Sequence, residues 1–161
     1  MTALETHGDK ALAVNAVQRL ECELLKMPQA DIVTTHNFRP GFYERTITIP
    51  PRTVLTGAPH KTPYTVRLDQ GTIAVNTDDG IKVLTAPCEF NAPAGVKRVG
   101  FTADDQVIWT DVYVNEDNCQ DIPTLEARFY DLTDCELGEN RRLRIANQII
   151  QLEGEPSCQD G

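Results

Sequence analysis

The stretch LTGAPHKTPYTVRLDQGTIAVNTDDG, residues 55–80, decides the fold. Two short runs in it, residues 64–68 and 72–76, are rich in β-branched and aromatic residues and alternate apolar with polar side chains, which is typical of half-buried strands. Gly71 separates the two runs, and Asp79-Gly80 follows the second, where a tight hairpin turn requires positive φ. The stretch therefore predicts consecutive antiparallel strands joined by short turns.

The same cadence extends through residues 35–130. Short β-rich runs such as FYERTITI, IKVL and QVIWTDVYV start about 8–12 residues apart and alternate with turn residues, a spacing typical of all-β sandwiches and barrels rather than of βαβ units. Prolines lie where these runs end, as expected of residues that cannot donate to a β-ladder. We predict an all-β antiparallel jelly roll over residues 35–130, an architecture that protects its sheet edges.

A helical arm is predicted before this domain, in residues 1–34. Apolar side chains recur at helical spacing in residues 9–28; they are Leu12, Ala16, Val17, Leu20, Leu24 and Met27. Asp9 suits the N-cap, and Pro28 ends the helix because its ring clashes with the preceding turn. The apolar stripe packs either on the chain's own domain or on a partner subunit, and the sequence leaves both open.

A C-terminal extension, residues 131–161, is expected to be helical or mixed. The apolar residues of its run ENRRLRIANQIIQLEG, residues 139–154, fit both a helix (Leu143, Ala146, Ile150) and a strand (Leu143, Ile145, Ile149). We favour a helix that ends at Gly154.

Composition narrows the class of protein. The 161 residues carry a net charge of −9, which repels nucleic acid and anionic lipid, and no run approaches the about 18 apolar residues of a membrane span. The N-terminus MTALETHGDK lacks the basic and apolar regions of a signal peptide. Five cysteines without a C-x-x-C pair are expected to be reduced thiols rather than zinc ligands. We therefore expect cytoplasmic synthesis, with no nucleic-acid and no membrane partner.

His60 lies in a segment that resembles the first metal motif of the cupin superfamily, whose members are small jelly-roll barrels. That motif runs Gly, five residues, His-x-His, three or four residues, Glu, six residues, Gly. With its last glycine placed on Gly71, the three ligand positions fall on Ala58, His60 and Tyr64. The resemblance implies a cupin-like double-stranded β-helix in which His60 stands in the barrel pocket.

The second cupin motif, Pro-x-Gly-x-x-His, resembles PAGVKR, residues 93–98, with Pro93 and Gly95 in place and Arg98 where the histidine would be. One imidazole does not hold a divalent ion against water, and a permanently charged guanidinium would repel that ion. The resemblance therefore implies degenerate metal motifs, and we expect a pocket that holds no metal and no other cofactor.

A longer segment, approximately residues 25–130, resembles a family of small cupin-like proteins encoded by tailed bacteriophages and prophages. The elements that carry this resemblance are H-x-F-x-x-G-x-Y-x-R at 36–45, I-P-x-x-T at 49–53, H-K-T at 60–62, P-x-G-x-K-R at 93–98, and the acidic pair Asp104-Asp105 before Trp109. Many members carry histidine at the positions of Tyr64 and Tyr113, which would give them a metal site that this chain lacks. The resemblance implies a phage setting and no established activity.

The candidate ligand-binding residues are cationic, aromatic or acidic: His60, Tyr64, Arg67, Lys97, Arg98, Trp109, Asp111 and Tyr113. Lys97-Arg98 opposite His60-Lys61 would present cations to a phosphate or carboxylate. Alternatively, Lys97 and Arg98 are strand-edge charges that neutralise the nearby pair at residues 104–105.

Cations that point into the barrel would need a partner, because burying an unpaired charge is costly. Asp111 is the expected partner, since it shares a strand face with Trp109 and Tyr113. Tyr43 and Arg45 also share a face of their strand, and we interpret them as ordinary packing. No G-x-S-x-G elbow and no G-x-x-x-x-G-K-[ST] phosphate loop occurs in the sequence, and we assign no catalytic residue.

Two functional hypotheses follow. The one we favour is a non-enzymatic virion structural or accessory subunit that acts through protein–protein contacts, forms a homo-oligomer, binds other phage structural proteins, and resides in the virion or the host cytoplasm. The alternative is a cupin that binds a small anion resembling a sugar or nucleotide, as an enzyme or a sequestering protein. The candidate ligand residues motivate the alternative, and the absence of a complete ligand set motivates the first.

Overall fold

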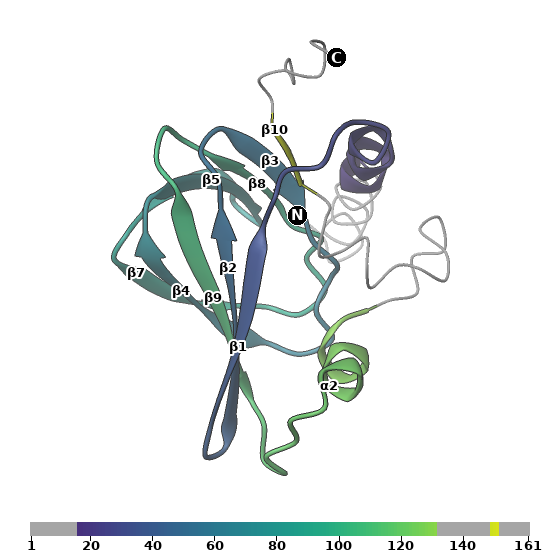
Figure 1. Cartoon of the computed structure of the whole chain (residues 1–161), viewed down its shortest axis with the longest axis vertical. Helices are drawn as coiled ribbons and strands as arrows, with labels where there is room; N and C mark the ends of the chain where they lie inside the picture. The colour runs from purple at the N-terminus through teal and green to yellow at the C-terminus, as the bar shows by residue number, and fades with distance from the viewer. Residues whose placement is uncertain (1–15, 132–148, 152–161) are drawn as a thin grey trace, which may run out of the picture.

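Two antiparallel sheets of five strands each form the body of the computed structural model, which describes residues 16–131 and 149–151 (Figure 1). In the first sheet the order is β1 (Val33–Arg39), β2 (Phe42–Ile49), β9 (Val107–Val114), β4 (Tyr64–Gln70) and β7 (Cys88–Ala92). In the second it is β10 (Ile149–Gln151), β3 (Thr53–Thr56), β8 (Val99–Thr102), β5 (Thr72–Thr77) and β6 (Gly80–Thr85). Strands distant in the chain thus lie side by side, and the all-β, cupin-like jelly roll predicted from the sequence is confirmed.

The core lies between the sheets because successive residues of a strand face opposite sides. In β4, Tyr64, Val66 and Leu68 are buried and the residues between them are not. Ile73 and Val75 of β5 face them from the second sheet. Leu125 and Phe129 of helix α2 (Ile122–Phe129), which follows β9, complete this core at one end. The predicted jelly-roll range thus includes a helix that sequence analysis did not assign.

The turns that frame β5 confirm the expected hairpin. Thr77 pairs with Gly80 across a two-residue connection, and Gly80 has a φ of 102°. Gly71, between β4 and β5, has a φ of 89°. A Cβ atom at Gly71 would lie 2.4 Å from the carbonyl oxygen of Gln106, whereas a Cβ atom at Gly80 would meet nothing within 4 Å. Both glycines supply positive φ, and only Gly71 also permits a close approach of two backbones.

Gly71→Ala is therefore expected to lower the free energy of unfolding by about 2–3 kcal/mol, the combined cost of positive φ and of overpacking. Gly80→Ala is the matched control, with an expected loss of about 1 kcal/mol from φ alone. Urea denaturation of both variants measures the difference. Equal losses would contradict the role of the close approach at Gly71.

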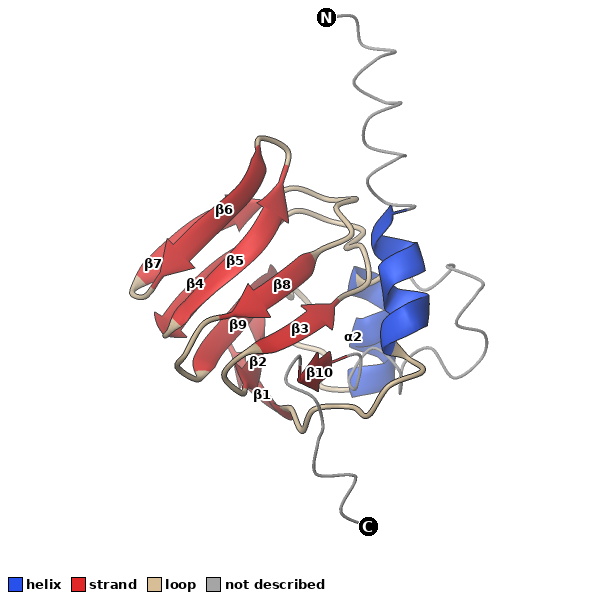
Figure 2. Cartoon of the chain, turned by 90° about the horizontal axis from the view of Figure 1, so that it is seen from above, coloured by secondary structure: helices blue, strands red, loops and turns tan. Residues whose placement is uncertain are grey.

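The N-terminal helix, described over residues 16–24, packs on the second sheet (Figure 2). Its buried face is Val17, Glu21 and Leu24, and Leu24 contacts Val54 of β3. The predicted stripe is therefore partly wrong: Leu20 and Met27 are 37% and 49% exposed. Packing in cis, one of the two open alternatives, holds for the described part of the arm.

A buried ion pair explains why the helix turns an acidic residue inward. Both Glu21 carboxylate oxygens accept hydrogen bonds from the Lys97 Nζ, at 2.8 and 2.9 Å, and the two side chains are 2% and 0% exposed. The Thr56 hydroxyl donates to the same carboxylate at 2.7 Å. Because these contacts satisfy the charge, Glu21 occupies the buried face that the hydrophobic pattern had given to Leu20.

The C-terminal prediction is corrected at residues 149–151. Ile149, Ile150 and Gln151 form β10, which pairs antiparallel with β3, and not the favoured helix. An unpaired sheet edge offers a row of backbone donors and acceptors, and this tertiary pairing overrides the helical spacing of the run. The remaining residues of that helix prediction, and the N-cap at Asp9, lie outside the described residues, as does Gly154.

Candidate functional site

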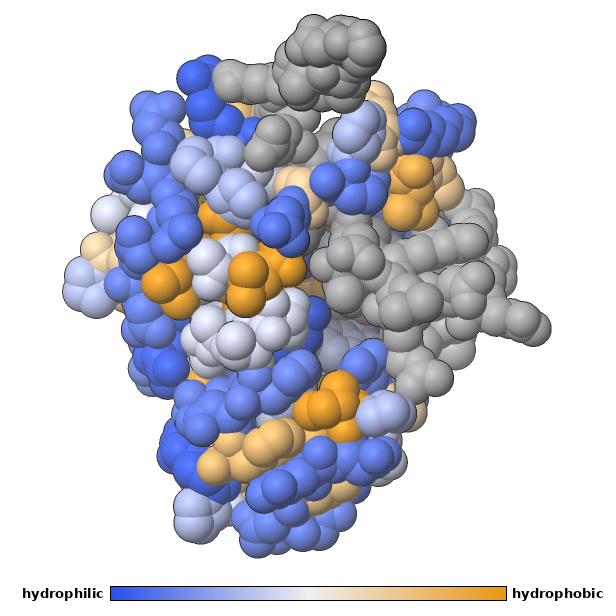
Figure 3. Space-filling model, viewed as in Figure 1, coloured by the Kyte–Doolittle hydropathy of each residue, from blue (hydrophilic) through white to orange (hydrophobic). Residues whose placement is uncertain are grey.

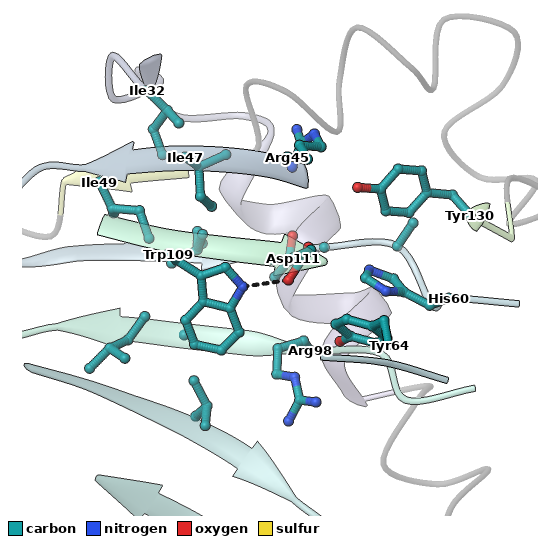
Figure 4. A pocket seen from close by; sticks show the side chains of 17 residues that line it. Ile32, Arg45, Ile47, Ile49, His60, Tyr64, Arg98, Trp109, Asp111 and Tyr130 are labelled. Atoms are coloured by element: carbon teal, nitrogen blue, oxygen red, sulfur yellow. Dashed lines mark hydrogen bonds between the residues drawn. The ribbon is translucent and has the colours of Figure 1, made fainter. Parts of the chain in front are cut away.

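A cavity of about 80 Å³ lies between the sheets, and Tyr130, the C-cap residue of α2, is part of its lining (Figure 4). Hydrophobic residues such as Ile47 and Ile73 form one part of its lining. The charged and aromatic part of the lining comes from three strands and three loops and consists of Arg45, His60, Tyr64, Arg98, Trp109, Asp111 and Tyr130. Charged, aromatic and hydrogen-bonding groups therefore converge on one small interior space.

The structure brings together five of the predicted site residues in this lining: His60, Tyr64, Arg98, Trp109 and Asp111. Ala58 lines the same cavity, so the four positions selected by the two sequence motifs all face it. Tyr113 lies directly behind, with its hydroxyl 3.4 Å from both the His60 Nδ1 and the Asp111 Oδ2.

Two predicted site residues lie elsewhere. Arg67 is on the outer face of β4, where it pairs with Glu44 and Asp69 at 3.4 and 3.3 Å. Residue 67 is an odd number of positions from Tyr64, so strand alternation directs it away from the cavity. Lys97 pairs with Glu21 beneath the N-terminal helix. It therefore neither presents its charge at the mouth of the pocket nor pairs with the acidic residues 104–105, the two positions considered from the sequence.

Two charged or aromatic residues of the lining were missed by sequence analysis. Arg45 of β2 lies opposite Asp111 of β9 in the strand register, and its guanidinium carbon is 5.8 Å from the centre of the Tyr130 ring. The sequence did contain a signal for Arg45: it is separated by an even number of positions from Tyr43, Ile47 and Ile49, so it shares their inward face of the strand. Tyr130, just after α2, carried no such signal.

Backbone hydrogen bonds fix His60 from both sides. The Gly95 N–H donates to the His60 carbonyl at 2.9 Å, which ties the β7–β8 loop to it. The neighbouring Lys61 N–H donates to the Phe129 carbonyl at 2.8 Å, which ties it to the end of α2. The imidazole packs on the Tyr64 ring with 3.8 Å between ring centres. The motif glycine Gly95, itself at a φ of 87°, thus positions the pocket histidine.

Burial and charge set the protonation of the site. Burial, followed by the charges of Arg45 and Arg98, lowers the pKa of His60 to about 3, so the imidazole is neutral at pH 7. Burial raises the pKa of Asp111 to about 6, although the hydrogen bond from Trp109 and the two guanidinium charges oppose this shift. Burial also raises the pKa of Tyr64, which keeps its phenol protonated. The pocket therefore holds two guanidinium cations and one carboxylate at neutral pH.

Asp111 is the centre of this arrangement. The Trp109 indole Nε1 donates to its Oδ1 at 2.7 Å, and Figure 4 shows Arg45 and Arg98 on opposite sides of it. Arg98 donates from Nη1 to the Asn76 carbonyl at 2.6 Å. Its Nε is buried and has no hydrogen-bond partner among the described residues. A buried donor without an acceptor is costly, and Arg98 is one of the residues that line the cavity.

A divalent metal ion, the cofactor that the fold family implies, does not fit this lining. His60 and Asp111 are its two side chains with the donor atoms that such ions prefer. Asp111 already accepts the Trp109 hydrogen bond, and two guanidinium groups face the same space. Among the described residues, no group of three or more His, Cys, Asp or Glu side chains could hold a metal ion.

The opposite pKa shifts predict opposite effects on stability. Because folding raises the pKa of Asp111 from 3.8 to about 6, its contribution to the free energy of unfolding falls as pH rises across that window. Because folding lowers the pKa of His60 from 6.5 to about 3, its contribution rises with pH between those values. Each slope approaches about 1.4 kcal/mol per pH unit.

Between pH 4 and 6, Asp111→Asn is expected to make stability fall more steeply on acidification than in the unmodified protein. His60→Gln is expected to make it fall less steeply. Urea denaturation at several pH values measures both slopes, and the comparison cancels the contributions of all other carboxylates. Parallel pH profiles for the three proteins would contradict the assigned protonation states.

Comparisons with known proteins give similarity of the fold alone. No family model and no curated protein matches the chain. An HTH_3 family transcriptional regulator from Vibrio cholerae is 11% identical over 52% of this chain and 51% of its own length, with a TM-score of 0.45. A cupin domain from Bordetella pertussis is 17% identical, and the match covers 55% of this chain and 98% of that domain, with a TM-score of 0.44. KdgF from a Halomonas species is 13% identical, and the match covers 55% of this chain and 88% of KdgF, with a TM-score of 0.45.

This chain spans about half the length of the Vibrio regulator. At these identities the similarity says nothing of activity. The sheet order described above, rather than any of these neighbours, defines the chain as a cupin-like jelly-roll protein.

In the part of the chain that the structure describes, no helix has the length and apolarity needed to span a bilayer. Cys88 and Cys119 are free thiols, and Cys135 and Cys158 lie outside that part.

Proposed function

We propose that the protein binds a small anion in the barrel cavity without using a metal ion. The observation that carries this proposal is the buried Arg98 Nε, which lacks a hydrogen-bond partner among the described residues. A carboxylate or phosphate oxygen supplies the acceptor this donor needs, and charged acceptors form the stronger hydrogen bonds.

The charge balance supports the same function. Arg45 and Arg98 face one carboxylate, that of Asp111, so the pocket carries a net positive charge when no ligand is bound. Burying an excess charge is unfavourable, and a bound anion neutralises it. The neutral His60 and the protonated Tyr64 add hydrogen-bonding groups without adding charge.

The size of the cavity limits what enters it. A volume of about 80 Å³ holds roughly five to eight water molecules at 10–15 Å³ each. This accommodates an acidic group of a few heavy atoms, and not a whole sugar or nucleotide. The broader anion class considered from the sequence therefore narrows to an acidic group held inside the barrel.

Thermal unfolding of metal-free protein with phosphate, sulfate, acetate or chloride tests the proposal. A ligand that prefers the folded state stabilises it by about 2.7 kcal/mol at 100 times its Kd. We expect a concentration-dependent rise in Tm with at least one oxyanion, and a smaller rise for Arg98→Met. The same small rise for every salt, chloride included, and for both proteins would contradict the proposal.

A virion structural or accessory role remains a second proposal, and an exposed apolar row favours it. Val83 of β6 and Phe101 of β8 flank Ala74 in register on the outer face of the second sheet, and Ile81 and Val83 are 77% and 69% exposed. On the face seen in Figure 3, by contrast, apolar side chains are scattered among hydrophilic ones.

Light scattering of the purified protein, with and without Val83→Glu, tests self-association through this row. We expect an oligomer that the substitution weakens, and detection of the protein by mass spectrometry of phage particles. A monomer that is absent from particles would contradict this second proposal. The phage origin stays a prediction until those measurements are made.

A further inference from the structure

A second cavity, of about 360 Å³, opens at the side of the barrel where β6 and β7 end their sheets. Its floor is apolar and consists of Leu84, Cys88 and Phe90, whose side chains also pack against the core. Its rim carries Asp78, Asp79 and Lys82, with Lys82 and Asp79 paired at 3.6 Å. We call this cavity the β6–β7 groove.

Arg98 lines both the β6–β7 groove and the inner cavity. Phe90, in the floor of the groove, contacts Trp109 of the inner cavity edge to face, with 6.1 Å between ring centres. Arg98, whose Nε is buried and has no described partner, is thus a residue that the linings of the two spaces share.

We propose that the two cavities form one binding site for a monocarboxylic acid with a hydrocarbon body. The carboxylate lies between Arg45 and Arg98, and the hydrocarbon body lies in the β6–β7 groove. This inference rests on the proposed anion-binding function and specifies its ligand class.

Charge complementarity selects an acid with a single negative end. The inner cavity has the excess of guanidinium charge, whereas the rim of the groove has two carboxylates and one ammonium group. A second anionic group at the far end of the ligand would therefore meet Asp78 and Asp79. The apolar floor between the two ends favours hydrocarbon over hydroxyl groups, since it offers few hydrogen-bond partners.

Size supports the same class. Small-molecule sites usually have volumes of about 300–1000 Å³. The volume of the groove falls within this range, whereas the volume of the inner cavity lies well below it. The inner cavity therefore admits the acidic group, and the groove is where the rest of the ligand finds room.

Isothermal titration with a series of straight-chain acids, from acetate to octanoate, tests this inference. Burial of each methylene group is expected to increase affinity by about fourfold once the chain enters the groove, so octanoate should bind far more tightly than acetate. Hexanedioate, with a second carboxylate, should bind more weakly than hexanoate. Equal affinities for acetate and octanoate would overturn the assignment of the groove.

Cys88→Met locates the hydrocarbon body. The larger side chain fills the groove floor, so it should weaken octanoate binding at least tenfold and leave acetate binding unchanged. Thr85→Met, at an exposed position of β6, is the matched control and should change neither. Octanoate binding that survives Cys88→Met unchanged would overturn the inference.

The two proposals fail in different ways. Acetate or phosphate binding that requires Arg98 but shows no dependence on chain length would overturn the groove and leave the anion site standing. Absence of binding for every acid and for phosphate would overturn both.

Discussion

Lys97→Met is expected to lower the free energy of unfolding by about 3–5 kcal/mol, the usual cost of breaking a buried ion pair by removing one partner. The variant leaves the Glu21 carboxylate inside the protein with the Thr56 hydroxyl but without the Nζ that lies 2.8 Å away. Glu21→Met should cost a comparable amount, because it leaves the Lys97 ammonium buried. Urea denaturation monitored by circular dichroism measures both losses.

The double variant Glu21→Met/Lys97→Met separates loss of the pair from loss of packing. Because two apolar side chains of similar size can replace a buried pair at little cost, the double variant should recover most of the stability lost in either single variant. Lys82→Met is the matched control, since Lys82 pairs with Asp79 at the surface, and it should change stability by less than about 1 kcal/mol. Single variants as stable as this control would contradict burial of the pair.

Arg98→Met and Arg45→Met are each expected to weaken binding of a small carboxylate or phosphate by about 10- to 100-fold. This range corresponds to the about 1.5–3 kcal/mol of a hydrogen bond to a charged group. Stability without ligand should change little in Arg98→Met, because loss of the bond to Asn76 is offset by removal of the buried Nε that has no described partner. Isothermal titration of each variant measures the affinity.

Arg67→Met is the matched control for these two variants. Arg67 carries the same charge, but it lies on the outer face of β4 with Glu44 and Asp69. Its replacement should leave the affinity unchanged. If Arg67→Met and Arg98→Met weakened binding equally, the effect would come from the overall charge of the protein, and the pocket assignment would be wrong.

The fold was predictable from local signals. Alternation in residues 64–68 and 72–76 and the glycines at positions 71 and 80 determine strands and turns, and those strands are present. β10 was not predictable, because its three residues are held by the edge of β3, which lies about a hundred residues earlier in the chain. Short segments that depend on a distant partner carry little signal of their own.

The residues that line the cavity were predictable where the alternation of side chains between the two faces of a strand was taken into account. His60, Tyr64 and Arg98, which the motifs selected, line one cavity with Trp109 and Asp111, which share a strand face. Arg67 lies outside the cavity, with Glu44 and Asp69, and its odd separation from Tyr64 indicates this position.

Arg45 required the pairing of β2 with β9, which places it opposite Asp111 and which no local pattern specifies. Glu21 and Lys97 were unpredictable for the same reason: each has the side chain of a surface residue, and only the tertiary contact between them makes burial favourable.

Trp109 allows the most direct test of the central claim, that this cupin-like barrel holds an anion where a divalent metal would be expected. It is the only tryptophan in the sequence, it lines the cavity, and it donates a hydrogen bond to Asp111. Titration of EDTA-treated protein with acetate or phosphate should change its fluorescence to saturation, and Arg98→Met should shift that response to about 10- to 100-fold higher concentrations. Zn²⁺ and Mn²⁺ should leave the fluorescence unchanged. A saturable response to either metal ion, with none to the anions, would contradict the claim.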